Sequence, residues 1–271
     1  MSGKHYSEQM VTTFTKHWSL IFALSKREIE ARYKGSFGGL GWYIIQTLIS
    51  VGVYSLVFGT IFKARWAETG QAPINFAMAL FIGLLVFNLF SESIGRASTL
   101  IITNANYVKK MVFPLEILPI VALMTALFNF IIGLIVFLVV CLVLQIDLSW
   151  TGLWLPVILA PFAIMVLGFM WFLASLGTFV RDTPQVVSLL TMIMMFLSPL
   201  FYPASTLPEE LQSLIQLNPV AFPMEQSRKA LLFGQSPDFS KLAIFTAIAF
   251  LVSALGYLWF RKTRKAFSDV L

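Results

Sequence analysis

Residues 117–145 read ILPIVALMTALFNFIIGLIVFLVVCLVLQ, and this stretch contains no charged side chain. An α-helix needs about 20 mainly apolar residues to cross the roughly 30 Å hydrocarbon core of a bilayer, so the stretch is long enough to span a membrane. The whole composition points the same way. Of the 271 residues, 58% are hydrophobic and only 12% are charged, and the mean hydropathy is +0.82. These values exclude an ordinary soluble domain.

Five further apolar stretches flank this one. They cover approximately residues 40–62, 74–95, 152–180, 185–202 and 241–260. We therefore expect an all-α integral membrane protein with six transmembrane helices. The third and fourth predicted spans exceed the minimum length and the fifth is short. The first 34 residues mix polar and charged side chains and have no apolar signal core, so we expect the N-terminus to be retained.

The positions of the basic residues predict the orientation in the membrane. Lys and Arg concentrate in the cytosolic loops of membrane proteins. If both termini are cytosolic, 14 of the 19 Lys and Arg residues lie on the cytosolic side, and the exceptions are Lys63, Arg65, Arg228, Lys229 and Lys241. The sequence therefore predicts a plasma or inner membrane protein with cytosolic N- and C-termini. The net charge of +6 reports this topology and does not indicate nucleic acid binding.

Two segments outside the spans are amphipathic. In the N-terminal segment, residues 1–35, one helical stripe predicts a helix in the membrane interface, with a plain cytosolic lead-in as the alternative; the stripe consists of Phe14, Trp18, Ile21, Phe22, Ile29 and Tyr33. Between spans five and six, residues 204–234 predict two short outer helices. The second should run from about Pro223 to Phe233 and end at Gly234. Such helices either re-enter the protein or rest on the bilayer surface.

Groups that carry out catalysis are scarce. The sequence offers no paired carboxylates, nucleophilic triad or metal-binding cluster, and Glu92 and Arg96 are interpreted as an ordinary pair within one helix. Neither an enzyme nor an ion-coupled carrier is favoured. The chain also lacks the G-x-x-x-x-G-K-[ST] phosphate loop, so energy must come from a partner. The lone cysteine, Cys141, lies in an apolar stretch and is interpreted as a core residue.

The segment between spans two and three, residues 96–114, is the best candidate for contact with that partner. Asn104 can cap a short helix that carries Tyr107 and ends before Pro114. A protruding helix with aromatic, apolar and basic side chains suits docking into another protein. Composition alone is equally consistent with a plain loop.

Aromatic residues suggest a substrate class. Their flat apolar faces match those of sugar rings, and many weak contacts suit a long glycan that must keep moving. Aromatic residues make up 15% of the chain. The candidates for a channel or gate are Tyr43, Phe87, Phe90, Trp171, Phe172, Phe196, Phe201 and Tyr202. Lipid-facing or interfacial positions are the alternative for each of them.

Four strings, in this order, resemble the ABC-2 permease family that exports O-antigen, capsular polysaccharide and teichoic acid. They are RYKGSFGGLGW (32–42), VFGTIFKARW (57–66), NYVKKMVFPLEILP (106–119) and SPLFYPASTLPE (198–209). The resemblance implies a permease subunit with no enzymatic activity or cofactor of its own, which moves a lipid-linked polysaccharide. The KARW string at 63–66 favours the O-antigen branch. Exporters of other glycans, of small lipids or of drugs, and a membrane glycosyltransferase, remain as alternatives.

The resemblance also implies an assembly. Residues 36–271 would form the transmembrane domain of a homodimer, and two copies of a separate ATPase subunit would bind ATP and Mg²⁺. Residues 204–234 would form an outer gate. The residues implied in contact with the ATPase are Arg27 and Arg32 in the N-terminal helix, and Asn104, Asn106, Tyr107, Lys109, Lys110 and Met111 in the helix at 104–113.

Overall fold

The computed structural model describes residues 17–34, 39–57, 73–108, 113–202 and 217–271, together with Pro208, Glu210, Gln212 and Ile215. Within these residues the secondary structure is helical and no strand occurs. The all-α prediction is confirmed for this part of the chain.

Five helices are long and apolar enough to cross a membrane. They are α3 (Gly39–Tyr54, continuing as a π-turn to Val57), α4 (Pro73–Ala97), α7 (Leu118–Val143), α8 (Leu155–Phe179) and α12 (Phe239–Thr263). Each lies within a few residues of a predicted span. The remaining predicted span, the fifth in chain order, coincides with α9 (Thr183–Leu197), an apolar helix of 15 residues that is shorter than the other five.

The helix starts follow local sequence signals. A proline occupies the first turn of α7, α8 and α9, where its missing N–H costs no hydrogen bond. Asp238 caps α12, because its side chain accepts a hydrogen bond from the Lys241 backbone N–H at 3.0 Å.

Short helices connect and flank the long ones. They are α2 (Trp18–Tyr33), α5 (Leu100–Thr103), α6 (Ala105–Val108), η3 (Leu115–Ile117), η4 (Trp150–Trp154), α11 (Ala221–Leu232), η6 (Arg264–Ala266) and α13 (Phe267–Val270). The second outer helix was predicted near Pro223–Phe233, and the structure has helix α11 at Ala221–Leu232. Gly234 follows α11 with φ +65°, the left-handed conformation expected of a glycine at a helix end. The first outer helix lies almost entirely outside the described residues.

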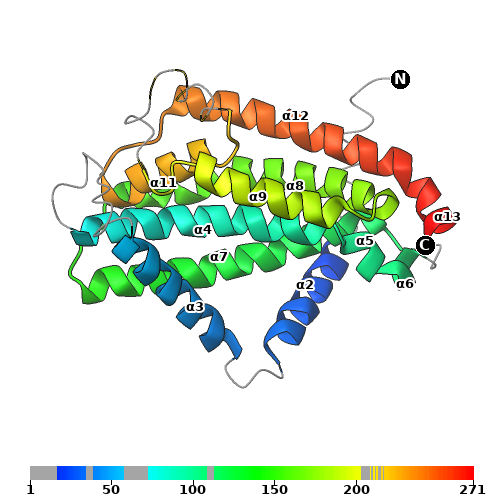
Figure 1. Ribbon diagram of the computed structural model, residues 1–271, viewed down its shortest axis with the longest axis horizontal. Coiled ribbons are helices and arrows are strands. Elements are labelled where there is room, and N and C mark those ends of the chain that lie inside the picture. The colour runs from blue at the N-terminus through cyan, green and yellow to red at the C-terminus, as the bar shows by residue number, and fades with distance from the viewer. Residues whose placement is uncertain are drawn as a thin grey trace.

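Helices α4, α7, α8, α9 and α12 run side by side along the long axis of the molecule, and α2 and α3 diverge from this bundle as the two arms of a V (Figure 1). Helix α11 lies at the end of the bundle where α4 begins, and α5, α6 and α13 lie at the opposite end. Helices α2 and α3 contact α7, and α3 also contacts α4, whereas α12 packs on α8.

The contact between α8 and α12 is made by their backbones. A Cβ atom on Gly256 would lie 2.0 Å from the carbonyl oxygen of Gly168, and one on Gly168 would lie 2.7 Å from Cα of Ser253. Only glycine permits so close an approach. Ser175 and Thr263 add a hydrogen bond of 2.7 Å between the two helices. Helices α8 and α12 therefore form one rigid pair.

A partly buried ion pair lies at the end of the α8–α12 pair where α12 ends. Glu116 in η3 is 5% exposed, and its side chain pairs with Arg264 just after α12. The backbone oxygen of Glu116 accepts a hydrogen bond of 3.0 Å from the indole N–H of Trp171 in α8. The start of α7 is thus tied to both members of the α8–α12 pair.

Candidate functional site

Helix α2 lies along the first half of α7. Ile21 is 1% exposed and packs against Ile117 and Val121. Farther along, the Tyr33 hydroxyl reaches Asn129 on α7. Residues later in α2 contact residues later in α7, so the two helices run in the same direction. Trp18, nearly one turn earlier on α2, is 59% exposed.

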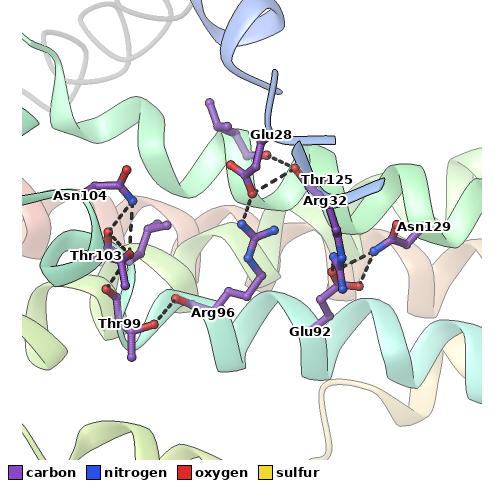
Figure 2. Close-up of polar contacts among 11 residues, drawn as sticks. Glu28, Arg32, Glu92, Arg96, Thr99, Thr103, Asn104, Thr125 and Asn129 are labelled. Carbon is purple, nitrogen blue, oxygen red and sulfur yellow. Dashed lines mark hydrogen bonds and ion pairs between the residues drawn. The ribbon is translucent and has the colours of Figure 1, made fainter. Parts of the chain in front are cut away.

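Two ion pairs, side by side, join α2 to α4 (Figure 2). Arg32 on α2 pairs with Glu92 on α4, and Arg96 on α4 pairs with Glu28 on α2. The second charged residue of one helix meets the first of the other, so the two helices run antiparallel here. The four side chains are between 18% and 43% exposed. We call these four residues, together with Thr125 and Asn129, the polar cluster.

The interpretation of Glu92 and Arg96 as a pair within one helix is wrong. Each of them finds a partner on α2 instead, because that helix carries Glu28 and Arg32 at the same four-residue spacing. A signal for this arrangement was present in the sequence, since both helices carry Glu followed by Arg four positions later. When two such helices run antiparallel, the Glu of each lies opposite the Arg of the other.

Uncharged side chains of α7 complete the cluster. The amide of Asn129, which is 1% exposed, donates to both carboxylate oxygens of Glu92 at 2.8 Å, and its oxygen accepts from the Tyr33 hydroxyl at 2.5 Å. The buried Thr125 hydroxyl lies 3.4 Å from the Glu28 carboxylate. Buried polar atoms are thus satisfied, and α2, α4 and α7 are held together.

The Arg32 guanidinium keeps its charge beside Glu92. Burial would lower the pKa of the Arg32 guanidinium, but the hydrogen bond and the negative charge of Glu92 outweigh it, and the pKa is raised. Burial also raises the pKa of the Tyr33 hydroxyl, which therefore stays protonated and keeps donating. The hydrogen bonds and ion pairs of the cluster thus connect α2, α4 and α7.

The polar cluster continues directly into the segment after α4. The Thr99 hydroxyl lies 3.4 Å from the carbonyl oxygen of Arg96, and Thr103 bonds back to Thr99 at 3.1 Å (Figure 2). A helix does follow Asn104, as predicted, but the Asn104 side chain does not cap it. Its amide donates backward to the carbonyl of Leu100 at 2.9 Å and so closes α5. This occurs because α5 precedes it and leaves carbonyl groups without partners.

Helix α2 also touches α6. Arg27 donates a hydrogen bond of 2.6 Å to the hydroxyl of Tyr107, and the Tyr107 ring stacks on Phe113 with centroids 4.4 Å apart. Asn106 on α6 is exposed. Lys109, Lys110 and Met111 lie outside the described residues. Of the residues predicted to contact an ATPase, the structure brings Arg27 and Tyr107 together and places Arg32 in the polar cluster.

The predicted channel aromatics fall into two groups. Phe87, Phe90 and Trp171 are at most 5% exposed and belong to the core of the helix bundle. The others lie toward the surface or at the end of α9: Phe172 is 39% exposed and Phe196 is 55% exposed, Tyr43 and Tyr202 are half-buried, and Phe201 is buried.

Phe201 is part of an aromatic cluster where α9 ends. Its ring lies 5.3 Å from Tyr54 and 6.1 Å from Phe196, and the Tyr202 hydroxyl donates to the carbonyl of Phe196 at 2.7 Å. Ser198 is extended at ψ 149°, so the predicted break in the helix at this point is confirmed.

Comparison with known proteins places these features in a family. Residues 19–232 match the family described as ABC-2 type transporter. The chain is 27% identical over 263 residues to the O-antigen export system permease protein RfbA of Myxococcus xanthus, covering 96% of this chain and 98% of that protein. It is 26% identical over 255 residues to the protein of the same name from Klebsiella pneumoniae, covering 94% and 95%. It is 24% identical over 252 residues to the polysialic acid transport protein KpsM of Escherichia coli, covering 88% and 92%.

The family match extends over most of the chain, from α2 through the polar cluster to the end of α11. The apolar helices and the likeness to permeases over nearly the full length agree with it. This protein belongs to the ABC-2 type transporter family.

Proposed function

We propose that this chain is the permease subunit of an ATP-driven exporter that moves a lipid-linked polysaccharide, of the O-antigen class, across the inner membrane. The observation that carries this proposal is the likeness to two O-antigen export permeases over at least 94% of both chains. ATP and Mg²⁺ bind to a separate ATPase subunit, and this chain is not itself an enzyme.

The proposed assembly is a homodimer with two ATPase copies. Residues 36–271 form the membrane domain, in which α9 is the fifth of six spans, and both termini lie in the cytosol. The exposed apolar faces of α3 and α9 support a contact with lipid or a second subunit, since Ile49 is 60% exposed and Leu189 is 54% exposed.

The polar cluster is the proposed route of energy coupling. Helix α2 lies at the cytosolic interface and inclines along α7, and the ATPase binds α2 and the segment 96–114. The two ion pairs join α2 to α4, and Arg27 joins α2 to Tyr107. A push on α2 or α6 therefore moves α4 and α7 as rigid bodies.

The proposed conduit for the glycan ends at the outer gate, residues 204–234. Phe196 and Tyr202 keep exposed surface at the end of α9, so their rings are available to sugar faces. Phe87, Phe90 and Trp171 are buried in the core of the protomer, so they support the helices around the conduit and do not line it.

A capsular polysaccharide is the second candidate substrate, and the likeness to KpsM favours it. Deletion of this chain in its host tests both. We expect surface polysaccharide to disappear and lipid-linked glycan to accumulate on the cytosolic side, and the structure of the accumulated glycan identifies the class. Normal surface polysaccharide after deletion would contradict the proposed function.

A further inference from the structure

Arg228 is the most deeply buried cation among the described residues, with 2% of its surface exposed. In the sequence, Arg228 is one of the few basic residues assigned to the outer side. It lies close to two other charged residues, Glu225 and Lys229, so nothing marks it as buried. The structure instead directs its side chain from α11 into the bundle. A buried guanidinium is tolerated only when its donors are well paired.

All three nitrogens of the guanidinium donate to backbone carbonyl groups. Nε donates to Ala79 on α4 at 2.7 Å, Nη1 donates to Pro199, and Nη2 donates to Leu200 at 3.1 Å. One side chain of α11 thus holds both α4 and the segment that follows α9.

The break after α9 creates acceptors that need such donors. In a continuous helix the Pro199 carbonyl would accept from the backbone N–H of residue 203, but residue 203 is a proline and has none. Arg228 supplies the missing donor. Asn218, just before α11, acts on the same break, because its amide donates to the Ser198 hydroxyl at 2.8 Å and to the Leu197 carbonyl at 3.3 Å.

The surface of α4 is shaped to receive the guanidinium. A Cβ atom on Gly83 would lie 2.2 Å from Nη2 of Arg228 and 2.8 Å from Cδ1 of Leu200. A side chain at position 83 would therefore displace the arginine, Leu200, or both.

We propose that Arg228 and Asn218 form an outer clasp, which locks α11 to the end of α9 and to α4 so that these parts move together. Arg228 is thus a positioning residue for the segment 198–202, including the buried Phe201. The consequence for transport rests on the proposed outer gate. The clasp itself does not depend on which substrate is carried.

Thiol labelling of purified, substrate-free protein in detergent tests the clasp. In a Cys141→Ala background, a reporter cysteine replaces Leu200, which is 0% exposed, and a second reporter in a separate protein replaces Ser175, which is also 0% exposed. Arg228→Lys keeps the charge but cannot form three such bonds, and Asn218→Asp keeps the size but loses the donor. We expect each to raise labelling at position 200 by roughly tenfold or more and to leave position 175 protected.

Two matched controls define the effect. Lys229→Gln changes the neighbouring cation of α11, whose side chain is half-buried, and should leave both reporters protected. Gly83→Ala should expose the reporter at 200, whereas Gly95→Ala on the same helix should not, because a Cβ atom there meets nothing within 4 Å.

The outcomes separate the clasp from general stability and from the proposed function. If the cysteine at position 200 stays protected from labelling in both Arg228→Lys and Asn218→Asp, the clasp is overturned. Equal labelling at positions 200 and 175 would also overturn it, because that result indicates a generally loosened fold. If Arg228→Lys does not accumulate, Asn218→Asp and Gly83→Ala decide. Because no substrate is present, a failure of polysaccharide export would leave the labelling result intact.

Discussion

Arg32 and Glu92 lie 60 positions apart in the sequence, yet their side chains form an ion pair that joins α2 to α4. The neighbouring pair of Arg96 and Glu28 repeats the connection one helical turn away. Two neighbouring connections resist rotation as well as separation, and they support the proposed transmission of movement between α2 and α4.

Reversing the charges of the first pair tests this connection. Arg32→Glu and Glu92→Arg should each lower export and thermal stability, because like charges then face each other, and the double reversal should restore most of both. The expected coupling free energy is about 1 kcal/mol, since the pair is partly exposed. A double-mutant cycle of thermal unfolding in detergent measures it.

The pair formed by Lys34 and Glu30 provides the control. It lies on α2 alone, and its side chains are 75% and 41% exposed. Reversing both charges there should change neither stability nor export. A coupling free energy at Arg32 and Glu92 that is no larger than this control would remove the ion pair from the account.

Asn129 offers a test inside the bundle. Asn129→Leu leaves the Glu92 carboxylate without two hydrogen-bond donors and the Tyr33 hydroxyl without its acceptor. We expect a loss of about 1 to 3 kcal/mol in the free energy of unfolding, the usual result of leaving buried polar groups unpaired. Asn88→Leu is the matched control, because Asn88 is exposed on α4. Equal effects of the two changes would contradict the role of Asn129.

Tyr107 connects α2 to the segment proposed to contact the ATPase. Tyr107→Phe removes only the hydroxyl that accepts from Arg27, whereas Tyr107→Ala also removes the ring that stacks on Phe113. Transport per ATP hydrolysed should fall modestly in Tyr107→Phe and strongly in Tyr107→Ala. Adding Met111→Ala to Tyr107→Ala should lower it further. Ser268→Ala, an exposed change near the C-terminus, is the control. Unchanged export in the Tyr107 and Met111 double variant would exclude this helix from coupling.

Cys141 is 0% exposed, and its sulfur lies 3.8 Å from that of Met78. Cys141→Ala should leave insertion and export intact and lower the free energy of unfolding by about 1 kcal/mol, the cost of a small cavity. Complementation of a deletion strain and a thermal melt measure the two quantities. Loss of export at normal expression would show a role for the thiol.

The sequence predicted the long helices well because their signal is local. Each apolar stretch, such as residues 117–145, is bounded by polar residues within a few positions of the observed helix ends. The break at Ser198 and the cap at Gly234 were also predictable, since proline and glycine constrain the backbone directly.

The polar cluster and the outer clasp depend on contacts between distant segments. The spacing of Glu92 and Arg96 permits a pair within α4, and only the proximity of α2 decides against it. Arg228 carries no local sign that its side chain turns inward, because the acceptors that hold it are backbone carbonyls of α4 and of residues 199 and 200.

Transport by inverted membrane vesicles tests the central claim most directly. Vesicles that contain this chain and its ATPase are supplied with lipid-linked O-antigen on the outer, cytosolic face, and protection of the glycan from an added glycosidase is measured over time. The account predicts protection that requires both ATP hydrolysis and this chain. Equal protection in vesicles that lack the chain, or none in vesicles that contain both subunits and hydrolyse ATP, would contradict it.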